Sequence, residues 1–138
     1  MKNVLLAIDG SDTTEKVVDM GIDLARHFDI QLHALHVIEP YSIPSDLPHN
    51  EEMYDYLLKK SNEIAEKTVK YAEERKITVS KNILEGEPAK RIIEFAEENS
   101  IDLIVMGTLG KSRLERIFVG SVTDKVLKLS SVSVMVIK

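Results

Sequence analysis

One glycine-rich stretch near the carboxyl end of the sequence combines the residue types that hold phosphate groups in proteins. Gly107 and Gly110 let the backbone turn and allow a ligand to approach it closely. Gly120 and Ser121 stand where a helix is expected to begin, and the free N–H groups and dipole of a helix start favour an anion. Ser121 and Thr123 add two hydroxyl groups that can donate hydrogen bonds. The stretch therefore predicts a phosphate site between a strand and a helix.

This stretch differs from two common nucleotide-binding loops. Gly110-Lys111-Ser112 has the ending of a P-loop, but a P-loop needs another glycine five residues before Gly110, where Val105 stands. The sequence also lacks a Gly-x-Gly-x-x-Gly pattern, so the dinucleotide fingerprint is absent. A glycine-rich loop without a ligand is the remaining alternative, because glycines commonly end strands and cap helices.

Charged side chains near this stretch and near the amino terminus are further candidates for ligand contacts. Lys111 and Arg113 either reach phosphate groups or belong to a solvated loop, and Arg116 is the weaker candidate of the three. Asp9 follows an apolar run that ends at Ile8, and in an open parallel sheet ligands bind beyond the carboxyl ends of strands. Asp9 therefore contacts a ligand or, alternatively, stabilises the start of the next helix.

The four histidines do not predict a metal site or a catalytic triad. His33 and His36 lie three residues apart on an expected strand, which directs their side chains to opposite faces. His27 and His49 have no convincing aspartate or serine partner in the sequence, so we interpret both as surface residues.

Apolar runs alternate with helical periods along the chain, which indicates a doubly wound α/β fold with a parallel sheet and helices on both faces. A helix is expected to begin at Ser11 and Asp12, with Glu15 completing a capping box. Its expected inner face includes Val17 and Phe28. Strands are expected at residues 4–8, 31–38, 78–84, 102–106 and 132–137, and further helices at about 51–75, from Pro88, and around 122–129. Three prolines make residues 39–50 a loop and a candidate lid.

Length and composition limit the number of domains and the classes of function that the protein can have. A chain of 138 residues fits a single domain, residues 1–138, with a packed core. No cysteine is present, which excludes disulfides and thiol nucleophiles. The net charge is −5 without a basic block, so the sequence predicts neither nucleic-acid binding nor a large positive surface. The first apolar run is too short for a signal peptide or a membrane span, and we expect a cytoplasmic protein.

The spacing Gly-x2-Gly-x9-Gly-Ser resembles the nucleotide motif of the universal stress protein family, in its ATP-binding branch. Other parts of the chain look similar to that family as well: the strand that ends in Ala7-Ile8-Asp9, the triplets Leu35-His36-Val37 and Gly86-Glu87-Pro88, and the terminal Val-Ile-Lys. The resemblance implies an open five-stranded parallel sheet with strand order 3-2-1-4-5, of the adenine nucleotide alpha hydrolase-like type. It also implies an ATP-binding protein, serving as a nucleotide-responsive stress or regulatory switch.

The resemblance further implies roles for individual residues. The aspartate after the first strand would meet the adenosine, the valine of the second strand would line the adenine pocket, and the glycine segment would hold ribose and phosphates. These roles fall on Asp9, Val37, Gly107, Gly110, Gly120, Ser121, Val122 and Thr123, with Ala7, Ile8 and Met106 completing the adenine surround and Lys111 and Arg113 near the phosphates. Leu109 departs from the family, in which many members have a polar or basic residue there.

The remaining expectations concern the metal ion, the oligomeric state and the alternative functions. Mg²⁺ or Mn²⁺ would bind through the ATP phosphates, because no cluster of carboxylates stands out in the sequence. The resemblance implies a homodimer that forms through the last strand, whereas the downstream protein partner is unknown. A slow ATPase or phosphotransferase is the first alternative function, although the sequence shows no evident general base or nucleophile. A purely structural oligomer without a ligand is the second.

Overall fold

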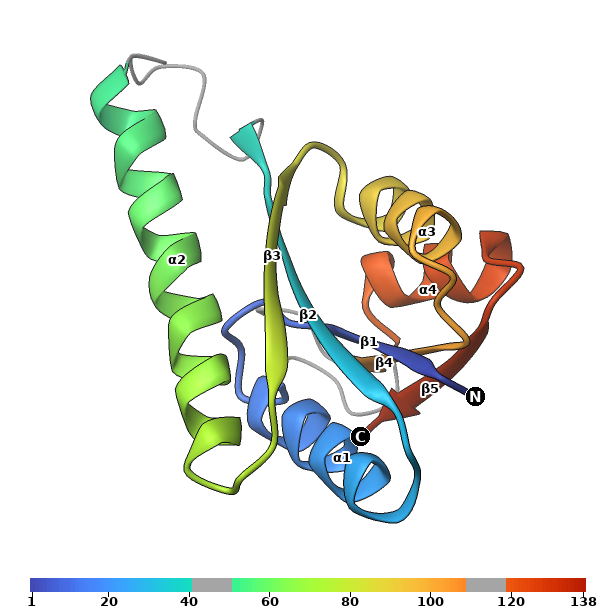
Figure 1. Ribbon diagram of the computed structural model, residues 1–138. Coiled ribbons are helices and arrows are strands. Elements are labelled where there is room, and N and C mark those ends of the chain that lie inside the picture. The colour runs from blue at the N-terminus through green and yellow to red at the C-terminus, as the bar shows by residue number, and fades with distance from the viewer. Residues whose placement is uncertain (41–50, 109–118) are drawn as a thin grey trace.

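The computed structural model describes residues 1–40, 51–108 and 119–138. Figure 1 shows one central sheet with helices packed on its two faces. The strands are β1 (Asn3–Ala7), β2 (Gln31–Ile38), β3 (Val79–Glu85), β4 (Leu103–Gly107) and β5 (Ser133–Ile137). The helices are α1 (Thr14–His27), α2 (Glu51–Glu73), α3 (Pro88–Glu98) and α4 (Ser121–Leu129). Most of the loop expected at residues 39–50 lies outside the described residues.

The sheet is parallel throughout and has the strand order β3-β2-β1-β4-β5, which confirms the expected topology. β1 lies at the centre, where Val4 pairs with Leu32 of β2 and with Leu103 of β4. Val4, Leu5 and Leu6 have no exposed surface, because helices cover both sides of this strand. The carboxyl ends of β2, β1 and β4 therefore lie side by side along one edge of the sheet.

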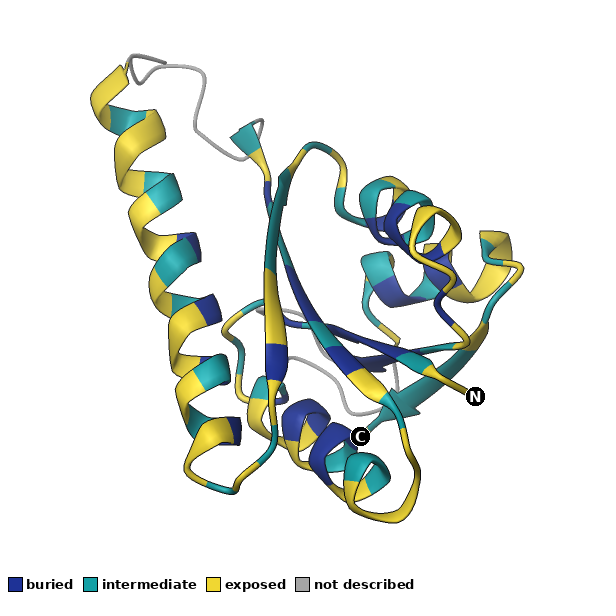
Figure 2. Cartoon of the chain, in the orientation of Figure 1, coloured by how far each residue is buried: buried dark blue, intermediate teal, exposed yellow. Residues whose placement is uncertain are grey.

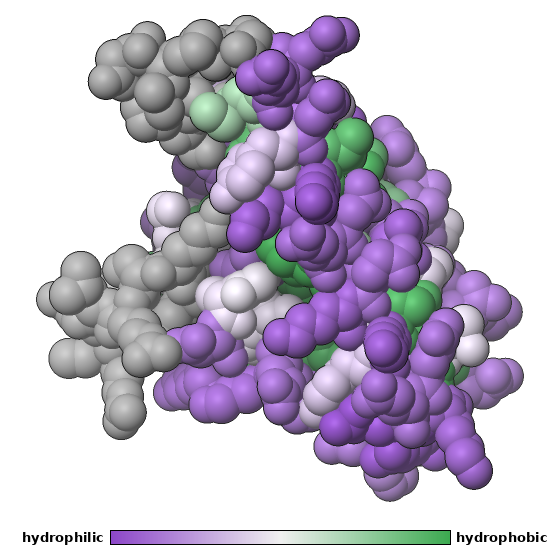
Figure 3. All heavy atoms as spheres, turned by 90° about the vertical axis from the view of Figure 1, so that its left-hand side faces the viewer, coloured by the Kyte–Doolittle hydropathy of each residue, from purple (hydrophilic) through white to green (hydrophobic). Residues whose placement is uncertain are grey.

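Two apolar layers hold the helices to the sheet (Figure 2). α1 and α2 cover one face, where the core includes Leu6, Ile22 and Val105. α3 and α4 cover the other face, where the core includes Leu5 and Ile104. The outer side of α2 is mainly hydrophilic (Figure 3), whereas its inner stripe is buried. Within the described residues, no helix is long and apolar enough to cross a membrane.

The start of α1 differs from the sequence prediction. The helix begins at Thr14 and has Thr13 as its N-cap, rather than Ser11 or Asp12. The carboxylate of Asp9 accounts for the difference, because it accepts hydrogen bonds from the backbone N–H of Ser11 (2.9 Å) and from the hydroxyl of Thr14 (3.1 Å). These bonds hold residues 11–13 in a turn, so the helix begins later. A second expectation is also wrong: Phe28, placed on the buried face, is 54% exposed at the end of the helix.

Candidate functional site

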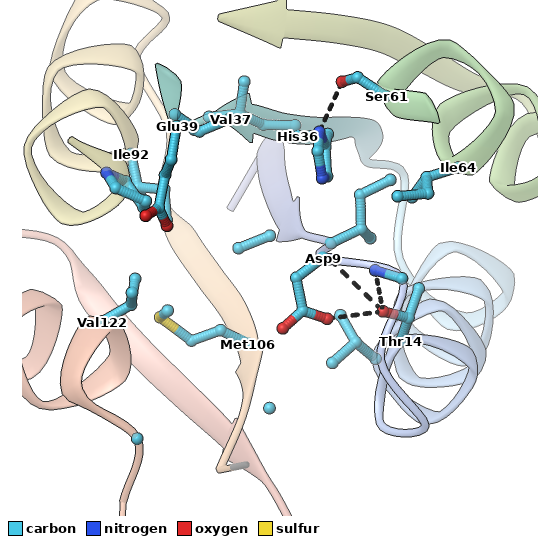
Figure 4. A pocket seen from close by; sticks show the side chains of 18 of the residues that line it. Asp9, Thr14, His36, Val37, Glu39, Ser61, Ile64, Ile92, Met106 and Val122 are labelled. Atoms are coloured by element: carbon cyan, nitrogen blue, oxygen red, sulfur yellow. Dashed lines mark hydrogen bonds between the residues drawn. The ribbon is translucent and has the colours of Figure 1, made fainter. Parts of the chain in front are cut away.

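A pocket of about 570 Å³ opens at the carboxyl edge of the sheet, a volume within the range of small-molecule sites. Its walls come from the ends of β1, β2 and β4, from the starts of α1, α3 and α4, and from the inner face of α2. It reaches around the end of β1 to both faces of the sheet: Ile8 packs in the α1/α2 core and Met106 in the α3/α4 core. Figure 4 shows side chains from these elements converging on one space.

Asp9 stands in the middle of this edge with an oriented carboxylate. Its Oδ1 atom accepts the bonds from Ser11 and Thr14, and the Thr14 hydroxyl oxygen in turn accepts the Gly10 N–H (3.1 Å). Gly10 has φ +78°, the left-handed conformation that a glycine adopts without strain and that this turn requires. Within the described part of the chain, Oδ2 of Asp9 has no hydrogen-bond partner, so it can accept a bond from a ligand hydroxyl.

The start of α4 forms one end of the pocket. Gly120 is the N-cap, and its N–H donates to the carbonyl of Thr108 (2.6 Å), which joins the helix start to the end of β4. The first N–H groups of a helix lack partners within the helix and, together with its dipole, favour an anion. The hydroxyl of Thr123 donates to the carbonyl of Gly107 (2.7 Å), so its hydrogen is engaged within the protein rather than offered to a ligand. Ser121, in contrast, is exposed at the helix start.

The α3/α4 side of the pocket is an apolar slot. Val37 at the end of β2 and Val122 on α4 face it, together with Met106 at the end of β4 and Ile92 on α3 (Figure 4). Side chains alternate along β2, so Val37 faces this slot while its neighbour His36 faces α2. An apolar slot beside a carboxylate and a helix start suits a flat, uncharged ring that is attached to polar groups.

Most of the site residues expected from the sequence lie together in this pocket. Those that line it are Ala7, Ile8, Asp9, Val37, Met106, Gly107, Gly120, Ser121, Val122 and Thr123. Gly110, Lys111 and Arg113 lie outside the described residues, as do Leu109 and Arg116. That any of these residues contacts a nucleotide remains a prediction.

Sequence analysis missed the wall that α2 contributes. Ser61 is fully buried, and its hydroxyl lies 2.5 Å from Nδ1 of His36. Lys60 also lines the pocket. His36 thus faces α2, whereas the ring of His33 packs against Phe95 of α3. His33 and His36 therefore lie on opposite faces of the sheet, as their spacing predicts. No sequence signal pairs Ser61 with His36, because the two residues lie on different elements 25 positions apart.

Sequence analysis also missed Glu39. It follows β2 directly and lines the pocket. In Figure 4 its carboxylate lies beside Ile92, on the same side as Val37 and Val122. The sequence places Glu39 at the start of a proline-rich loop, which gave no reason to distinguish it from other surface carboxylates.

The comparison with known proteins assigns the family. The chain matches the Universal stress protein family over residues 1–138. It belongs to the universal stress protein family. Universal stress protein MJ0531 of Methanocaldococcus jannaschii is 39% identical to this chain, over 99% of the chain and 82% of the relative.

Solved structures of similar proteins have the same fold. The structure described as hypothetical protein MJ0577 matches with a TM-score of 0.86 and 31% identity, over 99% of this chain and 95% of that one. The structure of the universal stress protein from Archaeoglobus fulgidus in complex with dAMP matches with a TM-score of 0.77, over 100% of this chain and 98% of that one. At 23% identity, the second likeness establishes the shared fold alone.

Proposed function

We propose that this universal stress protein binds ATP in the pocket at the carboxyl edge of the sheet and acts as a nucleotide-responsive switch. The observation that carries the proposal is that one pocket joins a helix start, an oriented carboxylate and an apolar slot. These are the three environments that phosphates, ribose hydroxyls and an adenine ring require. The dAMP complex of the Archaeoglobus fulgidus protein supports the proposal, because it is a chain of this fold that holds an adenine nucleotide.

The order of these groups along the sheet edge favours one orientation of the nucleotide in this proposal. The α4 start adjoins β4 and would hold the phosphates through backbone N–H groups of its first turn, beginning at Ser121, whereas the N–H of Gly120 already donates to Thr108. Asp9 follows the neighbouring strand β1, and its Oδ2 atom would accept a bond from a ribose hydroxyl. The adenine ring would then lie in the apolar slot beside Val37 and Val122. Gly110, Lys111 and Arg113 are further candidates at the phosphate end.

Mg²⁺ or Mn²⁺ would accompany ATP and bind chiefly through its phosphates. Among the described residues, no three histidine, aspartate or glutamate side chains lie together as ligands for a metal ion. Hard divalent cations take oxygen ligands, and Mg²⁺ often binds through substrate phosphates and water with few protein ligands. The proposed role of the cation is to neutralise phosphate charge in a pocket whose described walls include the carboxylates of Asp9 and Glu39.

We expect ATP to be a ligand that is turned over slowly or not at all. Phosphoryl transfer needs an oriented attacking group and stabilisation of charge in the transition state. In the described residues, the phosphate end offers helix N–H groups and the Ser121 hydroxyl, whereas Asp9 is oriented by Ser11 and Thr14 toward the middle of the pocket. Steady-state hydrolysis with Mg²⁺ should therefore fall well below the roughly 1–100 s⁻¹ typical of kinases.

The alternative is an ATPase or phosphotransferase. Ser121→Ala and Asp9→Ala provide the control, because activity from a contaminating enzyme would persist in both variants. A rate of roughly 1–100 s⁻¹ that either substitution abolished would favour the enzyme over the switch.

We also propose a homodimer that forms through β5. This strand lies at an edge of the sheet, and Val134 to Ile137 are only half-buried in the single chain. An apolar edge strand has unpaired backbone groups and tends to associate with another strand. Two-fold dimers are the commonest soluble homo-oligomers, and pairing of two copies through β5 would cover this edge. Because the strand order places β5 beside β4, ATP at the end of β4 could then influence assembly.

A further inference from the structure

Glu39 and the start of α4 adjoin different strand ends along the pocket. The sheet edge presents the ends of β2, β1 and β4 in that order. Neighbouring strands are about 4.8 Å apart, so the ends of β2 and β4 are separated by roughly 10 Å. Glu39 follows β2, whereas the N–H of Gly120 is bonded to Thr108, directly after β4. The backbone of Glu39 and the helix start thus lie about two strand spacings apart along one pocket.

The surroundings of the Glu39 carboxylate are apolar on the side that faces the slot. Figure 4 shows the carboxylate beside Ile92, with Val122 and Met106 across the same space. Asp9 supplies the other carboxylate among the described lining residues, and it stands one strand nearer to α4. The described walls therefore include a carboxylate in the apolar slot, on a residue that follows β2.

A nucleotide held with its phosphates at α4 and its ribose at Asp9 extends its base toward the end of β2. In a purine nucleotide, the ring edge that carries position 6 is remote from the bond to ribose, so this edge faces Glu39. Adenine has an amino group at position 6, which donates hydrogen bonds, and an ionised carboxylate only accepts them. We propose that Glu39 accepts a hydrogen bond from the 6-amino group and makes the pocket selective for 6-aminopurines.

This inference rests on the proposed nucleotide site and names the feature of the base that the site recognises. A bond from a neutral donor to an ionised acceptor is stronger than one between neutral groups. Glu39 is exposed, so water weakens the bond, and we expect loss of the 6-amino group to reduce affinity roughly tenfold. Because the determinant is a side chain, substitution can remove it without altering the backbone of β2.

The test measures four dissociation constants by titration calorimetry. The ligands are ATP and purine riboside triphosphate, which lacks only the 6-amino group, and the proteins are the wild type and Glu39→Ala. The wild type should bind ATP roughly tenfold more tightly than the second ligand, and Glu39→Ala should bind the two within about twofold of each other. Removal of a negative charge from the pocket affects both triphosphates alike, so it cancels from this ratio.

Glu97→Ala is the matched control, because Glu97 is an exposed glutamate at the far end of α3, away from the pocket. It should retain the wild-type ratio. If Glu39→Ala retained that ratio as well, or if the wild type bound both ligands equally, the role of Glu39 would be overturned while ATP binding stood. If the wild type bound neither triphosphate, the proposed function would fail together with this inference.

Discussion

ATP should raise the melting temperature of the wild-type protein, and Gly120→Val should remove this stabilisation. At a ligand concentration about 100 times the dissociation constant, binding adds roughly 2.7 kcal/mol to the free energy of unfolding. For a domain of this size, that corresponds to a shift of about 5–10 °C. Gly120 caps α4 with an extended ψ of 156°, which valine can adopt, so the variant should fold with its side chain against the phosphate end. Thermal denaturation of nucleotide-free protein, with and without ATP and Mg²⁺, measures both effects.

Ser130→Val serves as the control for damage to α4 itself. Ser130 caps the opposite end of the helix, and its hydroxyl oxygen accepts the N–H of Val132 (2.9 Å). Loss of a cap or of such a bond costs about 1 kcal/mol, so this variant should melt lower without ligand and still shift with ATP. A wild type whose melting temperature ATP leaves unchanged would contradict the proposed site.

The wild type should form a homodimer in solution, and Val136→Lys should convert it to a monomer. Val136 lies on the edge strand β5 and is half-buried in the single chain. A lysine there places a charge in the apolar contact between two such strands, which opposes their association. Multi-angle light scattering at high micromolar concentration distinguishes the two states. The double replacement of Val134 and Val136 by lysine should also give monomers, although Val134 packs against the α3/α4 core and its loss weakens the fold.

Leu129→Lys is the control for the dimer experiment. Leu129 is an apolar residue that is 70% exposed at the end of α4, outside the edge strand. A lysine introduced there should leave the dimer intact. A monomeric wild type, or a Val136→Lys variant that remained dimeric, would show that β5 is not the contact.

The fold could be predicted from the sequence because strong local patterns and a family resemblance agree. The bounds of β2 (Gln31–Ile38) are those expected from its apolar run, and Pro88 begins α3 as its fixed φ favours. The start of α1 was misplaced because its position depends on the carboxylate of Asp9. A cap pattern read along the sequence does not include a competing hydrogen bond from the preceding strand.

The candidate site could be predicted only where it follows the ends of strands. Asp9 and Gly107 were found because chain order fixes which residues come after β1 and β4. The bond between His36 and Ser61 depends on where α2 crosses β2, and helical periodicity does not determine that crossing. Glu39 escaped notice for a related reason, since its place in the pocket is defined by Ile92 and Val122 on helices far along the chain.

Binding of ATP to this pocket is the central claim, and titration calorimetry with nucleotide-free protein tests it most directly. The account predicts saturable binding with one ATP per chain in the presence of Mg²⁺, and a loss of most of that binding in Gly120→Val. Absence of saturable binding by the folded wild type at millimolar ATP would contradict the account.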